Sequence, residues 1–257
     1  MTPVLAFDIE TVPDCTGLRR LHNVDLPDQD VAAMAIQLRR QATGSDFMPV
    51  HLQRVVAISC ALRERDSFKV WSLGSPQDEE KTLISRFFEG IEKYSPQLVS
   101  WNGCSFDLPV LHYRSLIHGV RALRYWDWGD DDRDFKYNNY INRYHTRHLD
   151  LMDLLALHQT RNNVALDQIC KLCAFPGKIG MDGAQVWDAF QRGEIEAIRS
   201  YCETDAANTY LIFLRFQFLR GCLDQAQYER ECTLVRETLE KSASPHWREF
   251  LREWKSV

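Results

Sequence analysis

The chain has 257 residues, 45% of them hydrophobic, and a formal net charge of -5 from 31 basic and 36 acidic residues. This length and composition allow one large domain with a substantial core and exclude a disordered chain. The acidic balance also excludes a highly basic nucleic-acid-binding protein. A nucleic-acid partner is still possible, because positive charge is needed only along the path of the substrate.

No stretch approaches the ~18 uninterrupted apolar residues of a membrane helix, and the N-terminus lacks the pattern of a signal peptide. We therefore expect a soluble, cytoplasmic protein without a membrane partner. Eight cysteines lie mostly in apolar runs, which is typical of reduced thiols in a core. Cys170 and Cys173 have the spacing of zinc ligands, but no second pair accompanies them and both follow a helical apolar stripe. Zinc is therefore not expected.

The first half of the chain alternates between strands and helices. A buried strand is predicted over residues 4–11, and a polar insertion over residues 13–52 follows it with one helix over residues 29–41. The next elements, in chain order, are strands over 54–62 and 68–73, a helix over 75–94, a strand over 97–101 and a helix over 106–118. The first three strands are expected to form an antiparallel meander.

The second half is mainly helical. Residues 119–147 are irregular and mix aromatic with basic side chains, which is typical of a channel for a single strand and equally of a loop packed by its own rings. An acidic cluster at residues 130–132 argues against the channel. The predicted elements that follow are a strand over 148–151, helices over 166–173, 182–190 and 194–219, and two charged helices split at Ser244-Pro245.

The first strand ends in two carboxylates, Asp8 and Glu10. Side chains alternate along a strand, so both acids share one face, about 7 Å apart at ~3.3 Å per residue. Unpaired carboxylates at the end of a core strand cost several kcal/mol unless a cation lies between them. A divalent metal is the simplest such cation. The alternative is that the strand reaches the surface and water solvates both acids.

Two further acids lie on predicted helices, one at the start of a helix and one inside another. Asp107 stands where a loop leaves a strand and a helix begins, which is the edge at which sites form in open α/β sheets, although a helix N-cap has the same signature. Asp205 lies within an apolar helix, four residues after Tyr201 and therefore on the same face. A buried aspartate in mid-helix is rare unless it is paired or binds a metal. Glu203, off that face, is expected to be solvated.

Together these segments resemble a known family. Phe7-Asp8-Ile9-Glu10-Thr11 resembles the first motif of the DEDD 3'-5' exonuclease superfamily, residues 102–107 resemble the second, and residues 201–205 resemble the third in its Tyr-x-x-x-Asp form. Ser200 stands where the histidine branch of the superfamily has its histidine, which favours the tyrosine branch. Residues 102–111 and 166–178 are also similar to the proofreading domains of family-B DNA polymerases and their stand-alone relatives.

This resemblance implies a ribonuclease-H-like α/β fold. In that fold three antiparallel strands are continued by parallel strands, with helices on both faces, and the predicted order of elements agrees with it. The resemblance spans about residues 4–219, apart from the insertion. We therefore predict an exonuclease domain over residues 1–220 and a C-terminal helical extension over residues 221–257.

The resemblance also implies stepwise hydrolysis from a 3' end with two divalent ions per site, Mg²⁺ or Mn²⁺. Such hard ions take oxygen ligands, and a pair of them clamps the attacking and leaving oxygens. By position, Asp8 bridges both ions, Glu10 and Asp205 complete the site of the nucleophile, and Asp107 holds the second ion through water. Tyr201 orients the attacking water, because a phenol with a pKa of ~10 is a poor base at neutral pH.

Four further residues are expected to contact the substrate: Thr11, Asn102, Phe106 and Lys178. Asn102 either contacts the substrate or braces its loop, and Phe106 packs on the terminal base or sugar, unless both only shape a turn. Lys178 meets a phosphate, unless it is a solvated loop lysine.

The expected partner is the 3' end of a single-stranded nucleic acid. The polymerase-like motifs favour DNA over RNA by analogy. The alternatives are a 3'-5' exoribonuclease, a non-catalytic nucleic-acid-binding protein on the same fold, and a hydrolase of small phosphodiesters. The sequence does not identify protein partners.

Overall fold

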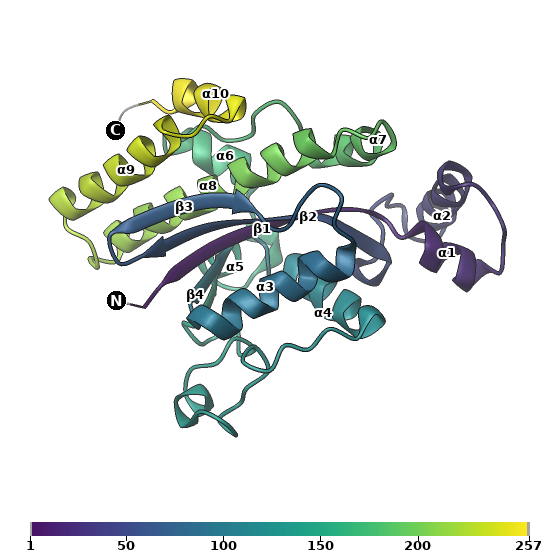
Figure 1. Cartoon of the computed structure of the whole chain (residues 1–257), viewed down its shortest axis with the longest axis horizontal. Helices are drawn as coiled ribbons and strands as arrows, with labels where there is room; N and C mark the ends of the chain where they lie inside the picture. The colour runs from purple at the N-terminus through teal and green to yellow at the C-terminus, as the bar shows by residue number, and fades with distance from the viewer. Residues whose placement is uncertain (1, 256–257) are drawn as a thin grey trace.

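The computed structural model describes residues 2–255, whose strands form a five-stranded sheet (Figure 1). β1 (Val4–Pro13), β2 (Gln53–Glu64) and β3 (Ser67–Ser72) form an antiparallel meander. β4 (Gln97–Ser100) and β5 (His148–Asp150) continue the sheet in parallel beside β1. The strand order β3-β2-β1-β4-β5 places β1 at the centre and confirms the predicted ribonuclease-H-like fold.

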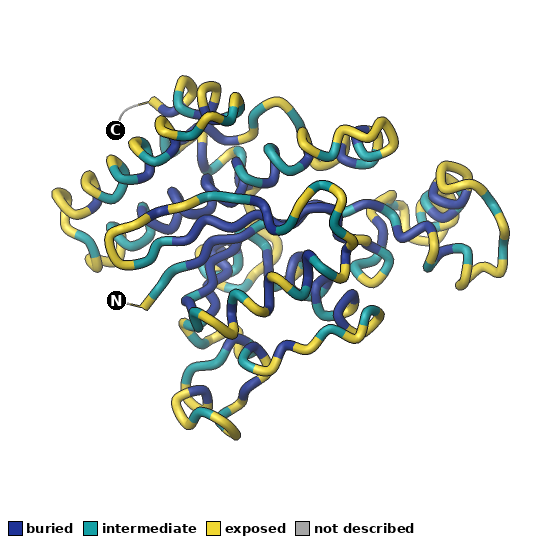
Figure 2. Tube along the Cα trace, viewed as in Figure 1, coloured by how far each residue is buried: buried dark blue, intermediate teal, exposed yellow. Residues whose placement is uncertain are grey.

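The alternation of side chains along β1 separates two helical layers. Leu5, Phe7 and Ile9 pack on one face with α3 (Glu80–Tyr94) and α4 (Asp107–His118). Ala6 faces the other layer, which contains α6 (Leu166–Leu172), α7 (Val186–Gln191) and α8 (Ile195–Leu219). Figure 1 shows these layers on opposite sides of the sheet, and Figure 2 shows that the strands between them are largely buried. Both layers therefore meet at β1.

The remaining short elements lie between these helices and strands in the chain. They are α5 (Leu151–Leu155) and 3₁₀ turns at Val50–Leu52, Arg133–Lys136, Thr160–Asn162 and Gly183–Gln185. α3 begins later than predicted because the Asp78 carboxylate accepts hydrogen bonds from the Ser75 backbone and hydroxyl and closes a turn there. No helix within residues 2–255 is long and apolar enough to cross a membrane.

The two C-terminal helices pack against the main body. α9 (Gln225–Glu240) and α10 (Pro245–Glu253) bury Val235 and Phe250 in the same core cluster as α8. Glu231 of α9 also pairs with Arg63 of β2 through two bonds of 2.7 Å. The two predicted helices are therefore confirmed, and their apolar side chains extend the core of the sheet. The domain boundary at residue 220 stays a prediction.

The insertion contains two helices where the sequence predicted one. α2 (Asp28–Thr43) matches the prediction, but α1 (Cys15–His22) was missed. α1 is short and contains Gly17, which disfavours helix formation, and it is stabilised by the Asp14 N-cap and by burial of Leu18. Figure 1 shows both helices at one end of the sheet, next to the end of β1.

Candidate active site

The first pair of acids lies on β1, on the face that meets α8. Glu10 is buried, and Asp8 is half-buried with its Oδ2 atom inside the protein. Oxygens of both carboxylates and the Cys202 sulfur of α8 lie within 4.8 Å of one another. Cys202 Sγ donates a hydrogen bond of 3.3 Å to the Asp8 backbone carbonyl, which holds α8 against the strand. The alternative that water solvates both acids is therefore wrong.

Asp107 joins this pair from the other layer. It is the first residue of α4 and is buried, and its Oδ1 accepts a hydrogen bond of 3.2 Å from the backbone N–H of Ile9 in β1. The N-cap is instead Phe106, which makes no capping hydrogen bond through its side chain. The alternative of Asp107 as an N-cap is therefore wrong, because its carboxylate binds the strand between Asp8 and Glu10.

The loop before Asp107 is held by a second aspartate. The Asp150 carboxylate at the end of β5 accepts hydrogen bonds from the backbone N–H groups of Asn102 and Cys104, of 3.0 and 2.8 Å. Asn102 has a φ of 70°, a left-handed conformation that asparagine tolerates better than most residues. A Cβ at Gly103 would lie 2.2 Å from Ser100 Oγ, so glycine is required. Asn102 thus braces the loop through its backbone.

Tyr201 and Asp205 lie on α8, and both are buried. Burial raises the pKa of Asp205 to about 6, although the charge of Lys178 and a hydrogen bond from Tyr201 oppose this rise. Burial and the neighbouring acids raise the pKa of Tyr201 far above its usual value. The phenol therefore stays protonated at neutral pH and acts as a hydrogen-bond donor.

The four carboxylates repel one another. Burial raises the pKa of Asp8 well above its usual value, and the other three acids raise it further. Glu10 shows the same rise for the same reasons. Burial raises the pKa of Asp107 to about 7, and nearby aspartates add to the rise while its backbone hydrogen bonds oppose it. The charges of the other three acids therefore act on Asp8, whereas the ligand atoms within 4.8 Å of one another among the described residues are those of Asp8, Glu10 and Cys202. That the four acids share metal ions stays a prediction.

Lys178 is the cation that lowers the pKa of two of these acids, Glu10 and Asp205. Its side chain is exposed, and its Nζ lies 5.7 Å from the centroid of the Tyr201 ring. The loop that carries it is fixed because Asn208 of α8 exchanges hydrogen bonds of 3.3 and 2.8 Å with the backbone of Gly177. Lys178 is therefore exposed to solvent and also positioned at the acid cluster.

Thr11 and Phe106 lie at the edge of the cluster toward the insertion. The Thr11 hydroxyl donates a hydrogen bond of 2.9 Å to Gln53 Oε1, and Gln53 Nε2 donates one of 3.1 Å to the Met48 carbonyl. The Phe106 ring contacts Phe47 of the insertion at a centroid distance of 5.5 Å. Both predicted substrate residues therefore contact the segment that returns from the insertion to β2.

Comparison with known proteins identifies the family of this chain. Residues 45–254 match the family of predicted 3'-5' exonucleases related to the exonuclease domain of PolB. This chain belongs to that family. It is also similar to the family B DNA polymerase from the hyperthermophilic archaeon Pyrobaculum calidifontis, with a TM-score of 0.51 and 15% identity. The similarity covers 85% of this chain and 25% of the polymerase, and it shows a shared fold. No curated protein matches the sequence.

The match to the exonuclease family begins after β1. Asp8 and Glu10 therefore lie outside the matched residues, and the geometry brings them to the site. The match also includes α9 and α10, which the sequence resemblance left out.

Two residues of this candidate site were not predicted, and the surroundings of a third residue were predicted wrongly. Asp150 lies near the end of the fifth predicted strand, at the same edge as Asp107, and that position was an available signal. Cys202 gave no signal beyond the apolar stripe of its helix. Glu203 is not solvated: its carboxylate accepts hydrogen bonds of 2.9 and 2.8 Å from the backbone and hydroxyl of Ser72 and pairs with His246 at 3.1 Å. It attaches α8 to β3 and α10.

The aromatic segment at residues 119–147 is packed by its own rings. Tyr125 and Tyr140 are buried and stacked at 5.5 Å, and the guanidinium groups of Arg124 and Arg147 lie over the Phe135 ring. These three rings agree with the alternative of a self-packed loop, whereas the other four aromatic residues of the segment are exposed: Trp126, Trp128, Tyr137 and Tyr144.

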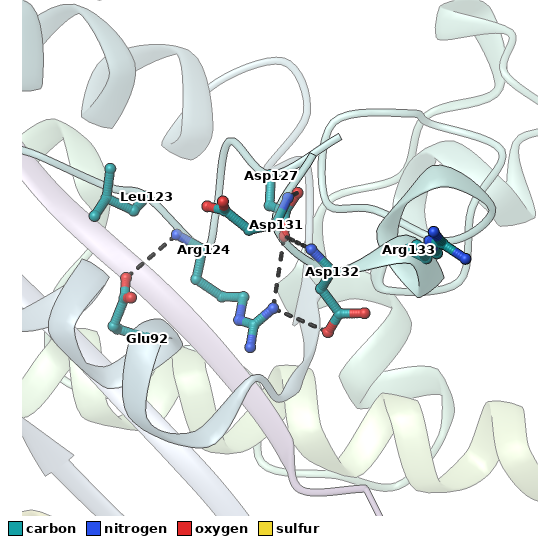
Figure 3. A pocket seen from close by; sticks show the side chains of 7 residues that line it. All are labelled: Glu92, Leu123, Arg124, Asp127, Asp131, Asp132 and Arg133. Carbon is teal, nitrogen blue, oxygen red and sulfur yellow. Dashed lines mark hydrogen bonds and ion pairs between the residues drawn. The ribbon is translucent and has the colours of Figure 1, made fainter. Parts of the chain in front are cut away.

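The acids of that segment line a pocket of about 410 Å³ together with Arg124. Figure 3 shows Arg124 pointing between Asp127 and Asp132, at 3.6 and 3.0 Å. The backbone N–H groups of Gly129 and Asp132 donate to the Asp127 carboxylate. These carboxylates are therefore partnered within the protein, in contrast to those on β1.

The acid cluster fits divalent metal ions. Asp8 Oδ2 and Asp205 Oδ1 are buried without a hydrogen-bond partner among residues 2–255. A proton or a cation neutralises such buried carboxylates, and hard ions such as Mg²⁺ and Mn²⁺ prefer oxygen ligands. Among the described residues, Cys170 and Cys173 belong to no group of three or more possible metal ligands. The candidate metal site is therefore the carboxylate cluster.

Proposed function

We propose that this protein is a 3'-5' exonuclease that removes nucleotides from the 3' end of single-stranded DNA and needs two divalent metal ions. The observation that carries the proposal is the gathering of four carboxylates from β1, α4 and α8, two of which have buried oxygens without a partner. The membership in a family of predicted 3'-5' exonucleases supports the same activity.

The residues that would hold the ions are Asp8, Glu10, Asp107 and Asp205. Bound there, Mg²⁺ or Mn²⁺ would lower the pKa of water and neutralise charge on the oxygens of the phosphodiester. Asp8 is the best candidate for a shared ligand, because the charges of all three other acids act on it. Replacement of any one acid leaves the repulsion among the others but removes part of the ligand set.

Tyr201 and Lys178 act on the substrate side of the cluster. Burial and the neighbouring acids raise the pKa of Tyr201 in the metal-free protein, so the phenol is suited to orient the attacking water or a phosphate oxygen by a hydrogen bond rather than to serve as the base. Lys178 places a positive charge near Glu10 and Asp205 and is free to meet a phosphate of the strand. Together they hold the scissile group without supplying the nucleophile.

The choice between DNA and RNA requires its own experiment. A single-stranded DNA and an RNA of equal sequence, both labelled at the 5' end, are digested in parallel with Mg²⁺. We expect faster shortening of the DNA, because the family of this chain is related to the exonuclease domain of a DNA polymerase. Degradation of the RNA alone would make the protein an exoribonuclease, and faster cleavage of short model esters than of either oligomer would assign it to small phosphodiesters.

A further inference from the structure

The insertion places an exposed aromatic ring against Phe106, the residue before Asp107. Phe47 follows α2 and exposes 59% of its side chain. Its ring lies 5.5 Å from that of Phe106, with the planes tilted by 56°, and Phe106 directly precedes Asp107. The two rings therefore form an aromatic pair at the N-terminal end of α4, whose first residue is Asp107.

Hydrogen bonds and burial hold Phe47 in this position. Its carbonyl accepts a bond of 2.9 Å from Arg39 Nε of α2, and the next residue, Met48, is buried in the core of the insertion. The Met48 carbonyl is linked through Gln53 to the hydroxyl of Thr11. Thr11 follows Glu10 at the point where the pairing of β1 with β2 shifts register. The ring is thus tied to the strand that carries the acids.

An uncharged side chain can hold a nucleic-acid strand where charged groups repel it. The acid cluster repels the phosphates of a strand until cations are bound, whereas an aromatic face attracts a base by stacking whatever its sequence. The exposed surface of Phe47 faces no aromatic ring other than that of Phe106 among the described residues. A ring with this exposure and this attachment is suited to a base at the end of a strand.

We propose that Phe47 is a substrate-positioning residue that stacks, together with Phe106, on the base of the 3'-terminal nucleotide. The proposal rests on the proposed exonuclease function. It gives the insertion a role: α1 and α2 support one wall of the site, and Phe47 is the side chain through which that wall meets the substrate.

The first test compares two 5'-labelled DNA strands that differ only in whether the 3'-terminal nucleotide carries a base. Phe47→Ala should slow removal of the normal terminal nucleotide about tenfold, mainly through KM, and should leave removal of the abasic one unchanged. Phe47→Tyr keeps the ring and should restore the rate. Leu21→Ala is the matched control, because Leu21 is 63% exposed in the same insertion.

A second measurement separates this proposal from the proposed function. Fluorescence of 2-aminopurine at the 3' end of the strand reports stacking when Ca²⁺ replaces Mg²⁺, because the acids are then neutralised while no hydrolysis is needed for the signal. Quenching by the wild type that is lost in Phe47→Ala supports the stacking role. Equal slowing of both strands, or quenching that persists in Phe47→Ala, would overturn it and leave the exonuclease intact. Failure of the wild type to bind or shorten any strand would overturn both.

Discussion

The backbone N–H of Ile9 in β1 donates a hydrogen bond of 3.2 Å to the carboxylate of Asp107 at the start of α4. These residues are 98 positions apart, and the bond fixes an acid of one layer between two acids of the strand. One carboxylate oxygen of Asp107, Oδ1, is thus engaged in a structural hydrogen bond.

Two substitutions of Asp107 separate its structural hydrogen bond to Ile9 from its proposed role as a metal ligand. Asp107→Asn keeps an acceptor for the Ile9 N–H and should fold as stably as the wild type in chelator, while the rate of hydrolysis falls at least a hundredfold. Asp107→Ala should lose the same activity and also ~1–3 kcal/mol of stability, because a buried N–H is left without a partner. Urea unfolding together with oligonucleotide digestion measures both. Equal stability of the two variants would contradict the structural role of the bond.

Tyr201→Phe tests whether the phenol positions rather than takes a proton. The ring remains beside Lys178 and the hydroxyl disappears, so the rate should fall about a hundredfold, of the order expected for a lost catalytic hydrogen bond. Stabilisation by Mg²⁺ should not change, because Tyr201 is not a carboxylate ligand. A thermal shift titration with Mg²⁺ checks this expectation. Wild-type turnover in the variant would remove Tyr201 from the mechanism.

The raised pKa values predict how pH acts on the metal-free protein. Asp107 and Asp205 have folded pKa values of about 7 and about 6, above the ~3.9 of an unfolded aspartate. Between these values the folded protein binds more protons than the unfolded chain, so its stability falls as pH rises from about 4 to about 7.

Mg²⁺ should offset this loss. The increase in melting temperature that Mg²⁺ causes should therefore be small at about pH 5 and large at about pH 8, because the ion competes with protons for the same oxygens. Asp205→Asn should reduce this dependence on pH. An increase that is independent of pH, or greatest in acid, would mean that Mg²⁺ binds elsewhere.

Arg114 should dominate the stability of the end of the sheet near the insertion. Its guanidinium pairs with Asp14 of the insertion and at 2.5 Å with Glu80 of α3, and only 3% of its side chain is exposed. Arg114→Met removes the guanidinium from both buried carboxylates, leaves only the His118 ring beside Glu80 at 2.6 Å and should cost about 3–5 kcal/mol. Urea unfolding measures this loss. Arg40→Ala, at the exposed pair with Asp46, is the control and should change nothing measurable. Equal effects would contradict the assignment.

Sequence patterns predicted the strands and most helices because each buries an apolar face with its own period. The same patterns left Asp107 open between a ligand and a cap, since the deciding partner, Ile9, is distant in the chain. Glu203 was predicted wrongly for the same reason: Ser72 and His246 reach it from other elements. α1 was missed because its stability comes from Asp14 and buried Leu18 rather than from helix propensity.

The most direct test of the central claim is a time course on a 5'-labelled DNA single strand with wild type and Asp8→Ala, in Mg²⁺, in Mn²⁺ and in chelator. We predict a ladder that shortens from the 3' end with wild type in either metal. No ladder should form in chelator or with Asp8→Ala, which should keep its folded state by circular dichroism. Degradation at the wild-type rate by folded Asp8→Ala would contradict the assignment of the carboxylate cluster as the catalytic centre.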